Sequence, residues 1–256
     1  MRKRIFNCDV DALTMEETIQ RIDEFILSGK PHQHVVLNVN KVLKANIDEK
    51  LSRTINACDL INCDGMPLVW ASRLLGQHLP ERVAGIDLFL DLVARAADKG
   101  WKVYFLGARE DVVQEIVEIF GKQYPKLQIA GYRNGYWTPE EEKNLVMSIQ
   151  KTEPDILFVA LGSPQKENFL NLYQASMNIP FAMGVGGSFD VVSGLTKRAP
   201  VWMQNSGLEW FHRFLQEPRR MFRRYFIEGS GFITLFIQEF CSFRLQKLRQ
   251  IIRKDS

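Results

Sequence analysis

The chain has 256 residues, of which 46% are hydrophobic and 25% charged, so it is expected to fold as a globular protein and not to stay disordered. Its four cysteines show neither a CxxC pair nor zinc-type spacing, which excludes a disulfide framework and indicates reduced thiols in the cytosol. The net charge of +3 is uneven: residues 210–256 hold ten Lys and Arg against four Asp and Glu, a balance of +6 that leaves −3 for the rest.

The beginning of the chain carries no secretion signal that we recognise. Met1–Arg4 is basic, but the following Ile5–Val10 is too short and too polar to be the apolar core of a signal peptide. No uninterrupted apolar run reaches the ~18 residues that a membrane-spanning helix needs. We therefore expect no spanning helix, and we expect the basic end of the chain to meet an anionic partner.

Short apolar runs alternate along the chain with helical patterns, which is typical of a parallel sheet flanked by helices. Several runs are bulky or β-branched throughout, as expected of strands that are buried on both faces. The predicted strands are His34–Asn38, Leu60–Cys63, Lys102–Leu106, Leu127–Ala130, Ile156–Leu161 and Phe181–Val185.

Helix start signals stand between these strands. Thr14 with Glu17, and Thr138 with Glu141, have the spacing of capping boxes. Helical spacing of apolar residues predicts further helices over Leu68–Leu75, Gly85–Lys99, Arg109–Tyr124 and Gln165–Met177. The pattern predicts a doubly wound, mostly parallel α/β domain over residues 1–200, followed by a basic, helical appendage over residues 201–256.

Polar residues and glycines gather where the predicted strands end. In doubly wound folds ligands bind beyond the carboxyl ends of the strands, so this rim is the predicted binding site. The residues concerned are Asn38, Asn40, Asp64, Gly65, Gly107, Gly162, Ser163, Pro164 and Gly184–Gly187.

Asp64 ends the second predicted strand just before a helical stretch. A transfer reaction in which a hydroxyl attacks needs one well-aimed base, and a carboxylate can serve. The alternative is that Asp64 caps the following helix. Its position alone supports the two interpretations equally.

Two further features suit a phosphate. The glycine-rich turn Gly184–Asp190 leads to a short helix, and such turns bring backbone amides close to anions, although a plain tight turn or a dinucleotide-binding turn has the same pattern. Arg82 can clamp a diphosphate bidentately, but an ordinary surface ion pair with Glu81 or Asp87 is the simpler explanation of its position.

The appendage interleaves arginines with aromatic residues. This composition suits a bilayer interface, and it also suits RNA or a solvated helix packed on the body. The histidines are scattered, and no metal site is expected. The arginines are Arg213, Arg219, Arg220, Arg223 and Arg224.

Taken together, these segments resemble the bacterial WecG/TagA/CpsF glycosyltransferase family from about residue 5 to about residue 225. The resemblance rests on their order and spacing. The matching segments are Asp64-Gly65, Glu81–Leu88, Gly162-Ser163-Pro164 with Glu167, Gly184–Asp190, Arg198-Ala199-Pro200, Gly207–Trp210 and Glu217–Arg220.

The resemblance implies a Rossmann-like core and an inverting, metal-independent transfer without a cofactor. It further implies a UDP-sugar donor of the N-acetylmannosamine type, an undecaprenyl-diphosphate-linked acceptor and a cytoplasmic protein bound peripherally to the inner face of the membrane. The products of the family enter teichoic acid or other cell-surface polysaccharides.

The resemblance also assigns residues. Asp64 matches the catalytic base, and the five appendage arginines named above match a segment that docks on the membrane and completes the site. The expected donor-binding residues are Asn38, Asn40, Arg82, Asp87, Gly107, Gln165, Lys166, Glu167, Gly186, Gly187 and Asp190.

The sequence departs from the family pattern at two places. The first strand commonly ends in Thr-x-Asn-x-Glu, whereas Asn38, Asn40 and Val42 stand here, so the donor sugar is open. The usual Pro-Lys-Gln-Glu is here Pro-Gln-Lys-Glu, with Gln165 and Lys166 interchanged. Both a monomer and a homo-oligomer are compatible with the sequence.

Two other classes compete with this interpretation. A nicotinamide-dependent oxidoreductase uses the same sheet, but no GxGxxG follows the first strand and no acidic residue stands suitably after such a turn. A basic-tailed RNA-binding protein without catalysis is the third class, although we expect no nucleic-acid partner.

Overall fold

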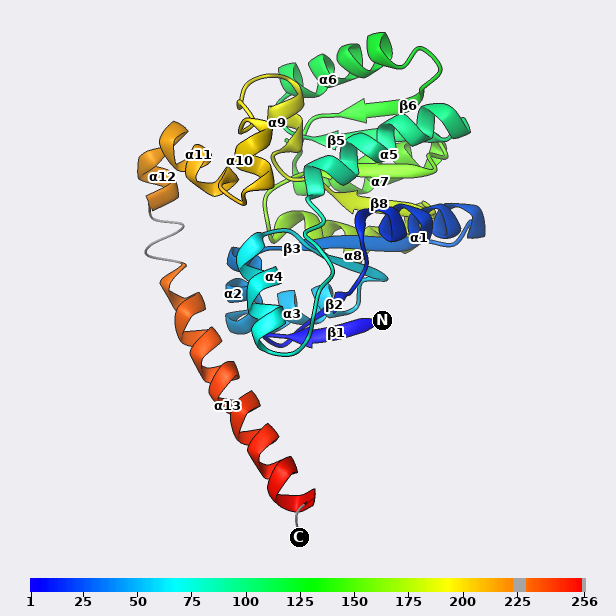
Figure 1. Ribbon diagram of the computed structural model, residues 1–256. Coiled ribbons are helices and arrows are strands. Elements are labelled where there is room, and N and C mark those ends of the chain that lie inside the picture. Colours follow the sequence, from blue (N-terminus) through cyan, green and yellow to red (C-terminus); the bar gives the residue numbers. More distant parts are fainter. Residues whose placement is uncertain (223–228, 255–256) are drawn as a thin grey trace.

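A six-stranded parallel sheet forms the centre of the computed structural model, which describes residues 1–222 and 229–254 (Figure 1). The strands lie in the order β4-β3-β8-β7-β5-β6. All six predicted strands are confirmed, and every pairing among them is parallel. Their bounds are β3 His32–Leu37, β4 Leu60–Cys63, β5 Lys102–Gly107, β6 Gln128–Arg133, β7 Ile156–Ala160 and β8 Phe181–Gly184.

Helices cover both faces of this sheet, so its central strands are apolar on both sides. In β7, Ile156 and Phe158 pack into the core on one face, whereas Leu157 and Val159 pack on the other. The first face is covered by α1 Met15–Ser28, α5 Gly85–Lys99, α6 Glu110–Gln123 and α9 Ser188–Val192. The second is covered by α2 Val39–Ile47, α3 Glu49–Asn56, α4 Met66–Leu74, α7 Pro139–Lys151 and α8 Gln165–Met177. The fold is therefore the Rossmann-like α/β class expected from the sequence.

Both predicted capping boxes are present. The Thr14 hydroxyl accepts a hydrogen bond from the Glu17 amide at 3.2 Å, and the Glu17 carboxylate accepts one from the Thr14 amide at 2.8 Å. Thr138 and Glu141 form the same motif at the start of α7. Each box satisfies amides that a helix start otherwise leaves without partners.

An antiparallel hairpin at the start of the chain was not predicted. β1 Arg2–Ile5 pairs with β2 Cys8–Asp11, and Ile5, Phe6 and Val10 are buried in the core on the second face. Asp11 fixes the hairpin to the sheet, because its carboxylate accepts a hydrogen bond from the Ile61 amide at 2.9 Å. The stretch from Ile5 to Val10, too polar for a signal peptide, is thus a turn and a strand of the core.

The described part of the appendage is helical, as predicted. α10 Val201–Asn205, α11 Glu209–Gln216 and α12 Pro218–Phe222 lie near the carboxyl ends of the strands (Figure 1). The long α13 Ser230–Lys254 packs on the body through its first half, and its C-terminal end extends beyond the body (Figure 1). None of the helices in the described ranges is long and apolar enough to cross a bilayer.

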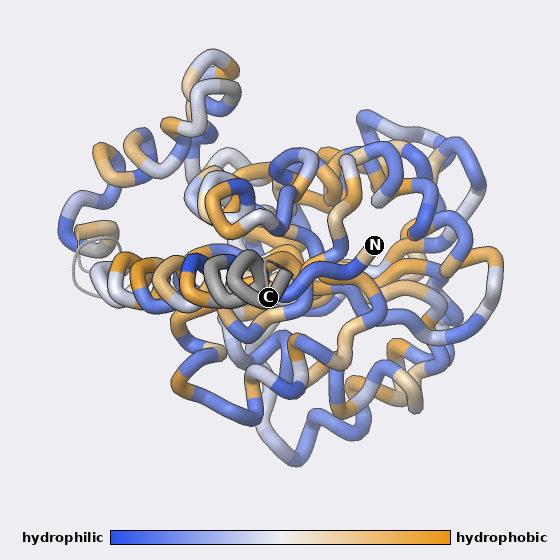
Figure 2. The backbone as a smooth tube through the Cα atoms, turned by 60° about the horizontal axis from the view of Figure 1, so that its bottom comes forward, coloured by the Kyte–Doolittle hydropathy of each residue, from blue (hydrophilic) through white to orange (hydrophobic). Residues whose placement is uncertain are grey.

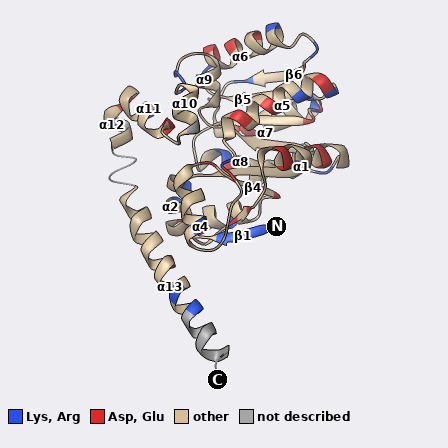
Figure 3. Ribbon diagram, in the orientation of Figure 1, with Lys and Arg blue, Asp and Glu red and all other residues tan. Residues whose placement is uncertain are grey.

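α13 is anchored by one apolar face, and hydrophobic and hydrophilic positions alternate along it (Figure 2). The ring of Phe232 lies 5.1 Å from that of Phe6, and the Glu239 carboxylate accepts a hydrogen bond from the Phe6 amide at 3.0 Å. Asp and Glu residues are concentrated on α1, α5 and α6, whereas Lys and Arg mark β1 and a part of α13 (Figure 3).

Candidate active site

Asp64 follows β4 at the carboxyl edge of the sheet, where its amide donates to the Leu37 carbonyl at 2.7 Å. Helix α4 begins after Gly65, whose φ of +134° suits glycine, and no side chain caps this helix. The capping alternative for Asp64 is therefore wrong. Its half-buried carboxylate instead faces the start of α5 and accepts from the Gly85 amide at 3.4 Å.

The surroundings of this carboxylate tune its basicity. Burial raises the pKa of Asp64 because the charged form loses solvation, and the nearby Glu209 raises it further. The guanidinium groups of Arg82 and Arg213 and the amide of Gly85 act in the opposite direction, but the net shift is upward. A carboxyl with a raised pKa is a better proton acceptor than an exposed one.

Arg82 pairs with a residue that is distant in the sequence. Its Nη1 lies 3.2 Å from Oε2 of Glu209, the first residue of α11, and both side chains are largely buried. The other carboxylate oxygen of Glu209, Oε1, lies 3.1 Å from Nη2 of Arg213. Arg82 thus forms an ion pair, but its partner is Glu209 and not Glu81 or Asp87. Glu81 instead accepts a hydrogen bond from the Met15 amide at 2.6 Å.

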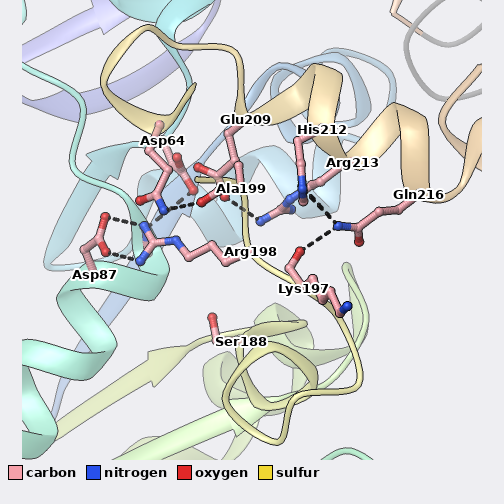
Figure 4. Close-up of polar contacts among 12 residues, drawn as sticks. Asp64, Asp87, Ser188, Lys197, Arg198, Ala199, Glu209, His212, Arg213 and Gln216 are labelled. Atoms are coloured by element: carbon pink, nitrogen blue, oxygen red, sulfur yellow. Dashed lines mark hydrogen bonds and ion pairs between the residues drawn. The ribbon is translucent and has the colours of Figure 1, made fainter. Parts of the chain in front are cut away.

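A second ion pair joins the same two parts of the chain. Asp87, in the first turn of α5, contacts Arg198 at 2.6 Å and 2.8 Å through both of its carboxylate oxygens (Figure 4). In the sequence, Arg198 and Glu209 stand out only as parts of short motifs, without a predicted role. Because their partners lie 111 and 127 residues away, no local pattern reveals either pair.

The predicted rim therefore gathers three carboxylates and three guanidinium groups beside the end of β4. The core supplies Asp64, Arg82 and Asp87, and the segment from residue 198 onward supplies Arg198, Glu209 and Arg213. Such a set offers one base together with several donors that can bind an anionic group bidentately.

The glycine-rich turn lies at the end of β8 as predicted. Gly186 has a φ of +54° and Gly187 is the N-cap of the short α9, which carries Asp190. Gly107, at the end of β5, has a φ of +118°, and a side chain there would meet the backbone of β7. The predicted turn before a short helix is therefore present, and its role in binding phosphate stays a prediction.

Gln165 and Lys166 have different environments, although they are neighbours at the start of α8. Gln165 is exposed, whereas Lys166 and Glu167 are buried. Oε1 of Glu167 lies 2.8 Å from Nζ of Lys41 and 3.3 Å from Nζ of Lys166. The carbon stem of Lys166 fills the space that a side chain at Gly184 would need. Lys166, and not Gln165, thus faces inward at the rim.

The charges of this buried cluster perturb one another. Burial lowers the pKa of Lys166 to about 8, and the neighbouring Lys41 acts in the same direction. Burial alone would raise the pKa of Glu167, but the ammonium groups of Lys41 and Lys166 lower it to about 2. Glu167 is therefore a buried carboxylate that stays charged.

The remaining predicted residues divide between the rim and places outside it. Asn38 caps α2, where its side chain accepts from the Lys41 amide at 3.0 Å, and the half-buried Asn40 lies in the first turn of the same helix. Arg219 is exposed on α12. Arg220 also lies in α12, and Arg223 and Arg224 fall outside the described residues. Within the described ranges no group of three or more His, Cys, Asp or Glu is arranged to hold a metal ion.

Comparisons with known proteins bear on this site. The sequence model described as "Glycosyl transferase WecG/TagA/CpsF family" matches residues 3–246. N-acetylglucosaminyldiphosphoundecaprenol N-acetyl-beta-D-mannosaminyltransferase of Bacillus subtilis (strain 168) is 39% identical over 167 residues, which are 65% of this chain and 64% of that relative. The protein of the same name from Bacillus spizizenii (strain W23) is 37% identical over 186 residues, 73% of this chain and 72% of that relative. The match to the first relative thus spans slightly less than two thirds of its length.

Proposed function

The chain belongs to the WecG/TagA/CpsF family of glycosyltransferases, and from this premise we propose that it transfers an N-acetylmannosamine-type sugar from a UDP-sugar to an undecaprenyl-diphosphate-linked acceptor. The names of both relatives state such an acceptor and such a sugar. The product then enters a cell-surface polysaccharide or a teichoic acid. The nicotinamide oxidoreductase considered from the sequence is wrong, because the family is a different one.

The gathering of Asp64, Arg82 and Arg213 is the observation that carries this proposal. The acceptor hydroxyl attacks the anomeric carbon of the donor and gives its proton to the Asp64 carboxylate. The bond between the anomeric carbon and the diphosphate oxygen breaks at the same time, with inversion. The guanidinium groups of Arg82 and Arg213 then stabilise the negative charge that develops on the leaving UDP.

Replacing the base tests the mechanism. Asp64→Asn keeps the size of the side chain but removes its ability to take a proton, so turnover should fall by ~10²–10⁴ while UDP affinity persists. Turnover is measured as UDP release with a short-chain lipid-diphosphate sugar as acceptor. Asp98→Asn, an exposed change at the end of α5, is the matched control and should leave turnover unchanged. Near-normal turnover of Asp64→Asn would contradict the assignment.

The proposal includes a transfer without a metal ion. Arginine side chains and backbone amides provide the positive charge that the diphosphate requires. Activity should therefore persist after dialysis against EDTA. A strict requirement for magnesium or manganese, restored by adding the ion back, would overturn this part of the proposal.

We also propose that residues 201–256 dock the enzyme on the inner face of the membrane, where an undecaprenyl acceptor resides. Besides its arginines, the segment exposes large apolar side chains on α10 to α13, which suit burial at a headgroup interface. These side chains are Val201, Trp202, Trp210, Phe211, Leu215, Phe222, Ile233, Ile237 and Leu245.

Charge neutralisation is a cleaner test of docking than truncation near residue 200, because α13 covers part of the core. Each basic residue near an anionic surface contributes about 1 kcal/mol, so removing four arginines should markedly reduce sedimentation with anionic liposomes. The difference should shrink at high salt, which screens the attraction. Unchanged sedimentation would refute the docking proposal. The four arginines are Arg219, Arg220, Arg223 and Arg224.

A further inference from the structure

Glu209 occupies an unusual position for a carboxylate. It is the first residue of α11, its side chain is only 12% exposed, and each of its two oxygens contacts a different guanidinium group. Oε2 pairs with Arg82 from the core. Oε1 pairs with Arg213 from the next turn of its own helix, and Glu209 and Arg213 are both labelled in Figure 4. The carboxylate thus lies between two arginines that come from different parts of the chain.

Proteins commonly bind phosphate in the same way, with two guanidinium groups that contact one anion. A carboxylate and a phosphate both present oxygens to the planar forks of the arginines, so one can replace the other with little movement of the cations. Arg82 and Arg213 both act electrostatically on Asp64, which places them beside the proposed base. The oxygens of Glu209 therefore lie where the oxygens of a leaving diphosphate would contact the same two arginines.

The charges at this place favour an exchange over simultaneous binding. Arg198 pairs directly with both oxygens of Asp87, whereas Arg82 and Arg213 are the cations in direct contact with Glu209 and also act on Asp64. A diphosphate brought to these arginines while Glu209 stays in place would put several negative charges together in a partly buried site, where repulsion is poorly screened.

We propose that Glu209 stands in for the diphosphate of the donor: it holds Arg82 and Arg213 side by side before the nucleotide binds, and it releases both to the nucleotide. This inference rests on the proposed function for the identity of the ligand. Glu209 is then a positioning residue that acts through the two arginines. Its release also removes a negative charge from the neighbourhood of Asp64.

A purely structural role predicts a different result when the charge is removed. If Glu209 only fastens α11 to the core, Glu209→Gln leaves Arg82 and Arg213 poorly placed, and UDP binding stays the same or weakens. If it stands in for the diphosphate, the same change removes a competitor, and UDP should bind about tenfold more tightly, equivalent to about 1.4 kcal/mol. Uridine, which lacks phosphate, should bind equally well to both proteins.

The experiment is isothermal titration of UDP and of uridine into the full chain, the Glu209→Gln variant and Asp98→Asn. The last is the control, because it also removes one negative charge but lies exposed at the far end of α5, outside the cluster of Arg82, Arg213 and Glu209. It should not tighten UDP binding. Should it do so as strongly as Glu209→Gln, general removal of negative charge would explain the effect and the inference would be overturned.

The remaining outcomes are also decisive. UDP affinity of Glu209→Gln equal to or below that of the unchanged protein overturns the stand-in role but leaves the proposed function intact. If the unchanged protein fails to bind UDP, the proposed donor is wrong and the inference is overturned with it. Where Glu209→Gln does not fold, as judged by circular dichroism, Glu209→Asp replaces it. Its shorter carboxylate cannot hold both guanidinium groups, so UDP should again bind more tightly than to the unchanged protein, and equal or weaker binding refutes the inference.

Discussion

Lys41→Met should destabilise the protein strongly, although Lys41 is a charged residue in a surface helix. Its side chain is only 7% exposed, and Nζ lies 2.8 Å from Oε1 of Glu167, whose side chain is 2% exposed. The same ammonium donates to the Val36 carbonyl at 2.7 Å. Methionine matches the length of the stem but leaves the buried Glu167 carboxylate without its closest cation.

The size of the expected loss of stability follows from the burial of this ion pair. Removing one partner of a buried ion pair costs about 3–5 kcal/mol, because the other charge remains desolvated. Lys166 stays 3.3 Å from the same oxygen and keeps part of the compensation, so we expect the lower end, about 3 kcal/mol. Lys44→Met is the matched control: it is exposed and lies three residues further along α2, so it should change stability by less than about 0.5 kcal/mol.

Urea unfolding at a series of pH values measures both effects. The carboxyl of Glu167 has a pKa of about 2 in the folded protein, below its ordinary value of 4.5. Its stabilising contribution is thus fully present above about pH 4.5 and is lost as the pH falls towards 2. In Lys41→Met the pKa of Glu167 should rise. The difference in unfolding free energy between this variant and the unchanged protein should therefore narrow as the pH falls from about 4.5 towards 2. A loss below 1 kcal/mol, or a gap that does not change with pH, would refute the reasoning.

Other predictions concern the backbone, the cysteines and the base. Gly107→Ala should destabilise the protein by at least about 1–3 kcal/mol, because φ is +118° and the new Cβ would lie 2.4 Å from a carbonyl oxygen of β7. Gly121→Ala, in an open position of α6, should instead stabilise the protein, and chemical denaturation compares the two variants. In the native protein a thiol reagent should modify the exposed Cys241 quickly and the three buried cysteines, whose pKa values are raised, only after denaturation. The raised pKa of Asp64 should place the acidic limb of kcat/KM above pH 3.8, and a limb at or below that value would argue against Asp64 as the base.

The sheet was predictable because its signal is local. Each strand is a short apolar run between turn residues, and a strand buried on both faces has no polar side to confuse the pattern. The capping boxes at Thr14 and Thr138 are similarly local, since three residues determine each. The position of Asp64 at the rim follows from the strand alone, because parallel strands present their carboxyl ends at one edge.

The hairpin and the ion pairs were not predictable for physical reasons. The turn between β1 and β2 places Phe6 and Asn7 at positive φ without any glycine, so the usual hairpin signal is missing. The partner of Arg82 is Glu209, which depends on how the appendage folds back over the core. Which of Gln165 and Lys166 faces inward depends on the angle at which α8 begins, which the order of residues does not specify.

The contact of α13 with the N-terminal hairpin has a consequence during synthesis. The Phe6 amide and the Glu239 carboxylate that accepts its hydrogen bond are 233 residues apart in the chain. At a translation rate of about 5–20 residues per second, roughly ten to fifty seconds pass between the appearance of the first and of the second on the ribosome. During that interval Phe6 lacks its ring contact with Phe232, which forms only after α13 has left the exit tunnel. α13 therefore completes the packing of a hairpin that was made more than two hundred residues earlier, and the nascent chain exposes an apolar surface until then.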